Sequence, residues 1–145
     1  MLLDAFTFSL GFKNSVAADV IQEANRFYAC CTTIRPNKDG SPDMNGYQAS
    51  MIENGIQKLE ERKDILPFAG GLVIAPTIKL AEYMAEIIRI KTNKKPVIVH
   101  NGLGSIECKS RIKRFKKNLS DDWLVSVDMI GEGVDIQRLR VLIYL

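Results

Sequence analysis

One stretch decides the fold: Trp123-Leu-Val-Ser-Val-Asp-Met-Ile-Gly-Glu-Gly-Val-Asp-Ile-Gln-Arg-Leu-Arg-Val-Leu-Ile-Tyr-Leu145. An apolar strand, Leu124 to Val127, enters a polar turn, and a second apolar run, Val141 to Leu145, leaves it. The turn holds three carboxylates beside two glycines, namely Asp128, Glu132 and Asp135 with Gly131 and Gly133. Carboxylates that follow a parallel-type strand lie where open α/β sheets bind ligands, and glycine lets the backbone approach a ligand closely. The alternative is a loop whose acids cap a short helix at Asp128 or Asp135.

Upstream of this stretch, short apolar strands alternate with amphipathic helices. Strands are predicted over 72–75, 97–99, 124–127 and 139–144. A helix capped by Thr77 is predicted to run to about Lys91, and a second begins at Ser105. The apolar stripe of this second helix consists of Cys108, Ile112, Phe115 and Leu119. Strand–helix alternation of this kind implies right-handed crossovers and a parallel sheet, and therefore an α/β fold.

The first part of the chain has a different pattern. Helices are predicted over 16–29 and 47–64, joined by a loop rich in Pro, Gly, Asn and Asp. Residues 1–10 are mostly apolar and are expected to dock on the core as a strand or a helix. We therefore expect a helical N-terminal segment and linker over residues 1–68, and a partial α/β domain over residues 69–145.

The composition of the chain excludes several classes of function. The chain has a formal net charge of +3, 46% hydrophobic and 26% charged residues, a balance typical of a globular domain. No apolar run approaches the ~20 residues that cross a membrane, so no membrane partner is expected. Three cysteines without a Cys-x-x-Cys spacing, and one histidine, offer too few ligands for zinc. Reduced thiols favour a cytoplasmic location.

The motifs resemble those of superfamily-two helicases, in the restriction-enzyme-translocase or DEAD-like branch. Residues 125–136, Val-Ser-Val-Asp-Met-Ile-Gly-Glu-Gly-Val-Asp-Ile, resemble motif V. Residues 69–77, Ala-Gly-Gly-Leu-Val-Ile-Ala-Pro-Thr, resemble the motif IV strand and the start of its helix. Residues 97–102 and 110–118 resemble the next strand with its loop and the helix before motif V. The likeness covers about residues 65–145.

This resemblance implies the second RecA-like domain of such a helicase, a three-layer parallel-sheet domain of the P-loop NTPase type. The sequence contains no Gly-x-x-x-x-Gly-Lys-Ser/Thr loop and no Asp-Glu-x-His or Asp-Glu-x-Asp box. It stops at Leu145, before the position where the resemblance places the arginine-bearing motif VI. We expect a fragment whose parent is an ATP-dependent helicase, with the first RecA-like domain as its partner. That domain would hold the ATP phosphates and Mg²⁺, so the isolated chain should not hydrolyse ATP.

The resemblance also implies site residues. Those on the nucleotide side are Gly131, Glu132, Gly133 and Asp135, with Asp135 near the ATP ribose. Those that contact the nucleic-acid backbone are Thr77, Ser105, Lys109, Lys113, Arg114 and Ser126. Each has a plainer alternative: Asp135 and Thr77 as helix caps, Glu132 as a surface acid, Ser126 as a strand residue, and the basic run as a solvated helix face. Val127 stands where many relatives carry a threonine that touches nucleic acid.

The expected function is that of a helicase or translocase motor domain acting on nucleic acid. We expect DNA as the partner, although these residues do not distinguish DNA from RNA. No catalytic residue and no resident metal are expected within the chain. The alternative is a non-catalytic nucleic-acid- or protein-binding module that kept the fold and lost the motor.

Overall fold

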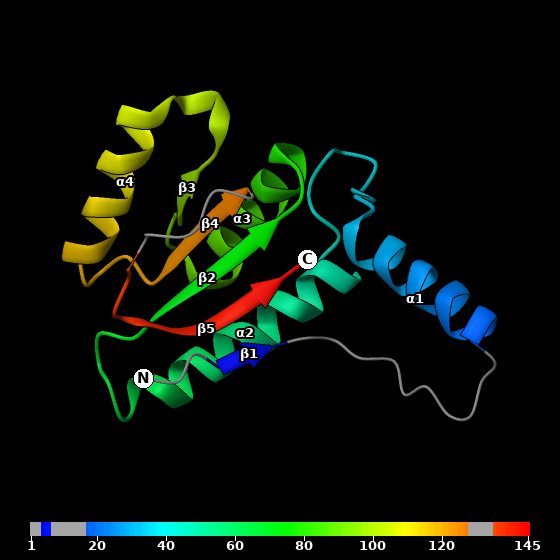
Figure 1. The fold of residues 1–145 in the computed structure, drawn as a ribbon, viewed down its shortest axis with the longest axis horizontal. Coiled ribbons are helices and arrows are strands. Elements are labelled where there is room, and N and C mark those ends of the chain that lie inside the picture. Colours follow the sequence, from blue (N-terminus) through cyan, green and yellow to red (C-terminus); the bar gives the residue numbers. More distant parts are fainter. Residues whose placement is uncertain (1–3, 7–16, 128–134) are drawn as a thin grey trace.

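The computed structural model describes residues 4–6, 17–127 and 135–145, which form a parallel β-sheet with helices on both faces (Figure 1). The five strands run in the order β1-β5-β2-β4-β3, and every neighbouring pair is parallel. Their bounds are Asp4–Phe6 for β1, Gly70–Ala75 for β2, Val97–Val99 for β3, Trp123–Val127 for β4 and Leu139–Tyr144 for β5. The predicted parallel α/β fold is confirmed.

The helices make this a three-layer domain. Their bounds are Ala17–Thr32 for α1, Tyr47–Lys63 for α2, Ile78–Thr92 for α3 and Ser105–Lys117 for α4. Helices α2 and α3 share one apolar core with the sheet residues Val73, Val125 and Ile143. Helix α4 packs on the other face, where its Cys108 and Phe115 meet Leu72 and Leu124. Figure 1 shows α1 beside α2, away from the sheet.

Helix α2 packs directly on the sheet, although it lies in the segment expected to precede the domain. A Cβ atom on Gly55 would lie 2.5 Å from Cδ1 of Ile143 and 3.2 Å from Cη2 of Trp123. Glycine inside a helix costs about 1 kcal/mol relative to alanine, and here it permits the close approach of α2 to β5 and β4. Helix α2 therefore shares one hydrophobic core with residues of β2, α3, β4 and β5.

The apolar stripe predicted for the helix from Ser105 is partly wrong. Cys108 and Phe115 are buried and Ile112 is half-buried, as expected, but Leu119 is 53% exposed. The helix ends at Lys117, and the side chain of Asn118 accepts hydrogen bonds from the backbone N–H and hydroxyl of Ser120. This turn takes Leu119 off the helical repeat and leaves it at the surface.

Part of the apolar N-terminus joins the sheet as a strand, one of the two predicted alternatives. Asp4–Phe6 pairs in parallel with residues Val141 to Ile143 of β5. Strand β5 therefore lies inside the sheet, between β1 and β2.

Candidate functional site

Three of the predicted site residues follow or end strands at the carboxyl edge of the sheet, where open α/β folds bind ligands. Thr77 follows β2, Ser105 begins α4 after β3, and Ser126 lies in β4. Thr77 is exposed, and its Oγ1 accepts a hydrogen bond of 3.2 Å from the N–H of Leu80. The hydroxyl therefore caps α3, as the plainer alternative predicted, while remaining at the surface.

The connection from β3 to α4 leaves the N-terminus of α4 open. Nδ1 of His100 accepts from the N–H of Gly102 at 3.1 Å, which fixes a turn over Asn101–Leu103. Gly104 then has φ +81°, a left-handed conformation that favours glycine, and no side chain caps the helix. Ser105 is exposed at its first position, so backbone N–H groups are available to an anion there.

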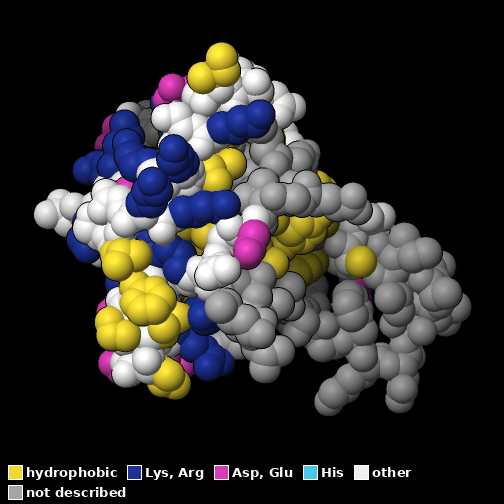
Figure 2. Space-filling view, turned by 60° about the vertical axis from the view of Figure 1, so that its left-hand side comes forward, with side chains coloured by type: hydrophobic (Ala, Val, Ile, Leu, Met, Phe, Trp, Pro, Cys, Tyr) yellow, Lys and Arg dark blue, Asp and Glu magenta, His cyan; other side chains and the backbone are white. Residues whose placement is uncertain are grey.

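Helix α4 has a strongly basic outer face. Two of its cations are paired: Arg111 with Glu107 at 2.7 Å and Arg114 with Asp121 at 3.4 Å. Arg111 also donates to the carbonyl of Ile98 at 2.9 Å, which ties the helix to edge strand β3. The exposed cations that make no ion pair with any described residue are Lys109, Lys113, Lys116 and Lys117. Figure 2 shows lysine and arginine side chains gathered in one dark-blue area.

Ser126 lies where a nucleic acid cannot reach it. The residue is fully buried between Ile74 of β2 and Val99 of β3, and its Oγ has no hydrogen-bond partner among the described residues. The alternative, that Ser126 is a strand residue, agrees with this position. Val127, where the motif V resemblance implied a threonine contact, is buried on the α2/α3 side of the sheet.

Most of the predicted nucleotide-side residues, Gly131, Glu132 and Gly133, lie outside the described residues. Asp135 is described, and its side chain is exposed. No helix begins at Asp135: the chain turns over Ile136–Leu139, closed by a 3.2 Å bond from the N–H of Leu139 to the carbonyl of Ile136, and enters β5. The carboxylate is therefore not used as a helix cap in the described part of the chain.

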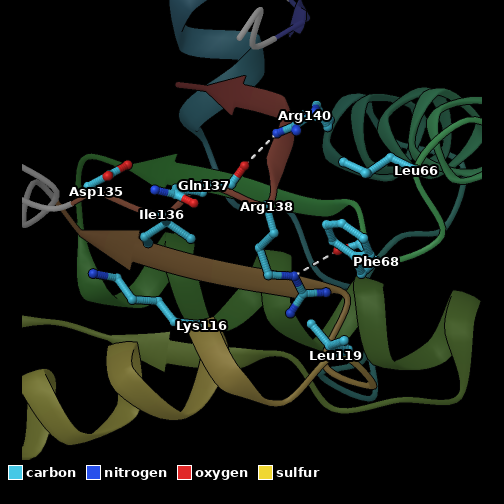
Figure 3. A pocket seen from close by; sticks show the side chains of 9 residues that line it. All are labelled: Leu66, Phe68, Lys116, Leu119, Asp135, Ile136, Gln137, Arg138 and Arg140. Atoms are coloured by element: carbon cyan, nitrogen blue, oxygen red, sulfur yellow. Dashed lines mark hydrogen bonds between the residues drawn. The ribbon is translucent and has the colours of Figure 1, made fainter.

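Asp135 lies at one end of a groove of about 700 Å³ (Figure 3). The groove is lined by the loop before β2, the end of α4 and the turn before β5, through Leu66, Phe68, Lys116, Leu119, Asp135, Ile136, Gln137, Arg138 and Arg140. Asp135 and Ile136 belong to the motif V stretch, and Gln137, Arg138 and Arg140 follow it closely in the sequence. Leu66, Phe68, Lys116 and Leu119 come from two other segments, and no local pattern in the sequence brings the three segments together.

Arg138 is the residue beside this groove that sequence reasoning missed. It is 4% exposed, and its guanidinium donates to three backbone carbonyls: Phe68 at 2.9 Å, Phe115 at 2.9 Å and Asn118 at 3.1 Å. The guanidinium also lies 4.5 Å from the centre of the Phe115 ring. Burial lowers the pKa of Arg138, and the charges of Asp122 and Asp121 act in the opposite direction. Arg138 thus joins the turn after motif V to α4 and to the start of β2.

The described residues contain no group of three or more His, Cys, Asp or Glu side chains that could hold a metal ion. Cys30 is half-buried, while Cys31 and Cys108 are buried, all as free thiols. Burial and the neighbouring Cys30 raise the pKa of Cys31, so its thiol stays protonated at neutral pH. Over the same residues, no helix is long and apolar enough to span a membrane.

Comparison with known proteins identifies relatives among helicases. An uncharacterised protein of Mycobacterium leprae is 36% identical over 99 residues, which cover 68% of this chain and 16% of that protein. The DEAD-box ATP-dependent RNA helicase 15 of Arabidopsis thaliana is 26% identical over 87 residues, or 60% of this chain and 20% of that protein. The chain therefore spans less than a quarter of the length of these relatives.

Solved structures share the fold. The second domain of the DEAD-box helicase Mss116p, bound to an RNA duplex, matches with a TM-score of 0.54 and 22% identity, over 67% of this chain and 37% of that one. The C-terminal domain of a Sulfolobus solfataricus SWI2/SNF2 ATPase matches with a TM-score of 0.58 and 13% identity, over 92% of this chain and 66% of that one. The family model described as "Helicase conserved C-terminal domain" matches residues 57–145. The chain belongs to this family of C-terminal helicase domains, as the resemblance to superfamily-two helicases implied.

Proposed function

We propose that this chain provides the second motor domain of an ATP-dependent helicase or translocase, with a nucleic-acid backbone on α4 and the ATP ribose beside Asp135. Family membership supports the motor role. The observation that carries the nucleic-acid side is the row of exposed lysines on α4 that form no ion pair with any described residue, next to a helix N-terminus without a side-chain cap at the carboxyl edge of the sheet. DNA is the proposed nucleic acid because motif V resembles that of the restriction-enzyme translocases.

The chemistry of α4 fits a backbone without sequence preference. Each lysine that neutralises a phosphate releases condensed counterions, so affinity depends on salt and not on base identity. The N–H groups at Ser105 can bind a phosphate oxygen, and the exposed hydroxyl of Thr77 offers a further contact at the same edge of the sheet.

On the nucleotide side, the exposed carboxylate of Asp135 can accept a hydrogen bond from a ribose hydroxyl. The sequence has no phosphate loop, so the proposed first RecA-like domain would hold the phosphates and Mg²⁺. ATP would then bind between two domains, of which this chain supplies one face.

Reversing two charges on α4 should weaken nucleic-acid binding and its salt dependence. We expect Lys109→Glu combined with Lys113→Glu to lower the affinity for a short labelled oligonucleotide by about tenfold or more. The slope of log affinity against log salt should flatten by about one unit for each phosphate that is no longer neutralised. Fluorescence anisotropy between about 50 and 200 mM salt measures both quantities. Single-stranded DNA and RNA of the same sequence are compared.

A matched control separates local contacts from net charge. Lys38→Glu combined with Lys58→Glu makes the same change, from +3 to −1, because each replacement removes one positive and adds one negative charge. Lys38 lies in the loop after α1, and Lys58 lies on α2, which packs on the opposite face of the sheet from α4 and where Lys58 pairs with Glu61 at 3.0 Å. This control should bind nearly as well as the wild type at physiological salt. Equal weakening in both double variants would remove α4 from the functional site.

The ribose contact can be tested by changing both partners. Asp135→Ala should weaken the binding of ADP by about tenfold, the expected cost of removing a hydrogen bond to a charged group. An ADP analogue without ribose hydroxyls should bind the wild type about tenfold more weakly than ADP does. The analogue should bind the wild type and Asp135→Ala with equal affinity. Nuclear magnetic resonance titration detects the weak affinities expected of a half-site. If Asp135→Ala still distinguishes ADP from the analogue, another group contacts the ribose.

A further inference from the structure

The groove beside Arg138 extends well beyond the carboxylate assigned to the nucleotide. Figure 3 shows Asp135 and Lys116 at one end and Leu66, Phe68 and Leu119 toward the other. The second end is formed by the loops that enter β2 and β4, and it therefore lies at the amino edge of the sheet, opposite the edge with Thr77 and Ser105. The proposed nucleic-acid and ribose contacts leave this end of the groove unused.

The amino-edge end is unusually apolar for a surface. Phe68 is 43% exposed and Leu119 is 53% exposed, and Ile65, in the same loop as Phe68, is 78% exposed. Figure 2 shows an apolar, yellow area directly beside the dark-blue basic area on this side of the molecule. A contiguous apolar patch with a polar rim is typical of an interaction site.

Positive charge predominates around the groove. Lys116, Arg138 and Arg140 line it, against one carboxylate, Asp135. Arg140 donates to the carbonyls of Gln137 and Leu139 at 2.6 and 2.7 Å, which holds its guanidinium at the groove. Arg138 is buried, donates to three carbonyls and is close enough to Asp121 and Asp122 for their charges to act on it, so the accessible positive charge of the groove comes from Lys116 and Arg140. The complementary ligand is therefore anionic as well as apolar.

We propose that this groove binds a protein segment in which one aromatic or aliphatic side chain is flanked by carboxylates. The apolar side chain would pack between Phe68 and Leu119, and the carboxylates would face Arg140 and Lys116. A volume of about 700 Å³ accommodates a few side chains of a peptide. A single apolar anchor in a pocket with a charged rim is how many interfaces obtain their affinity. The proposal requires neither nucleotide nor nucleic acid to be bound, and it shares only Lys116 with the lysine row of α4.

The test is a selection of short random peptides displayed on phage against the 145-residue chain. We expect enriched peptides to combine Asp or Glu with Phe, Tyr, Trp or Leu. The same peptides, synthesised with a fluorophore, should bind about tenfold or more weakly to Leu119→Asp and to Arg140→Glu, which corresponds to about 1.4 kcal/mol. Replacing the peptide carboxylates by lysines should abolish binding.

Ile90→Asp is the matched control, since Ile90 is 42% exposed on α3, on the other face of the sheet. It should bind the peptides within about twofold of the wild type. Fluorescence of the buried Trp123 and circular dichroism establish that each variant is folded. Enrichment of basic peptides, no enrichment at all, or equal binding by Leu119→Asp and the wild type would overturn the proposal. So would a concentration-dependent dimer abolished by Leu119→Asp, because a second copy would then fill the groove.

Discussion

Gly71→Ala should lower the free energy of unfolding by about 3 kcal/mol, at the upper end of what overpacking of a core usually costs. A Cβ atom at this position would lie 2.3 Å from Cζ3 and 2.5 Å from Cε3 of Trp123, its partner across β2 and β4. Trp123 is itself buried among α2 and the sheet, so the ring cannot move aside without displacing other core residues. Urea unfolding followed by fluorescence measures the effect, because Trp123 is the one tryptophan in the sequence.

A double-mutant cycle tests whether the ring is the cause. In a Trp123→Leu background, Gly71→Ala should lower the free energy of unfolding much less, because the ring atoms that would clash with the new Cβ are absent. Circular dichroism follows unfolding in this background. Gly46→Ala is the control, because a Cβ there would come no closer than 3.3 Å to another atom, Oδ2 at the end of the Asp43 side chain. Its cost should stay below about 1 kcal/mol. The same destabilisation by Gly71→Ala in both backgrounds would contradict the packing argument.

The strand–helix order from residue 70 onward could be predicted because its signals are local. The wholly apolar run of β2, the mostly apolar run of β4 and the spacing of Leu80, Met84 and Ile88 are sufficient to place strands and a helix. The packing of α2 on β5 could not be predicted in this way, because it depends on Gly55 and Ile143, far apart in the sequence. From the sequence alone, a glycine in a helix indicates only a lower helix propensity, because its role in close packing depends on the surface that the helix contacts.

The candidate site was predictable to a similar extent. The exposed positions of Lys109 and Lys113 follow from the helical repeat that buries Cys108 and Phe115. The burial of Ser126 does not follow from the same reasoning, because alternation in a strand gives a buried side and an exposed side only when one face of the sheet is open. Here helices cover both faces at β4, so each of its residues is buried.

The burial of Arg138 could not be predicted from the sequence, for a different reason. Arginine is rarely buried unless it is paired, so an arginine between Gln137 and Leu139 indicates a surface turn. Its burial depends on three carbonyls, at Phe68, Phe115 and Asn118, whose positions only the folded chain defines.

Arg138→Met should lower the free energy of unfolding by about 2–4 kcal/mol, because a methionine of similar length cannot donate to these three carbonyls. Hydrogen bonds from a charged donor are worth about 1.5–3 kcal/mol each, and a buried carbonyl left without a partner costs about 1–3 kcal/mol. Part of this destabilisation is offset, since burial of the guanidinium is itself unfavourable, as its lowered pKa indicates. The packing on the Phe115 ring is largely retained by a thioether. Urea unfolding followed by Trp123 fluorescence gives the change.

The comparison with two further variants shows which interaction is responsible. Arg138→Lys keeps the charge but cannot reproduce a planar donor that reaches three carbonyls, so it should be nearly as destabilising as Arg138→Met. Arg89→Met removes an arginine that pairs with Glu86 at the surface, and it should be far less destabilising than Arg138→Met because exposed ion pairs contribute little to stability. If Arg138→Met were as stable as the wild type, desolvation of the guanidinium would cancel its hydrogen bonds. That result would contradict a net stabilising role for Arg138.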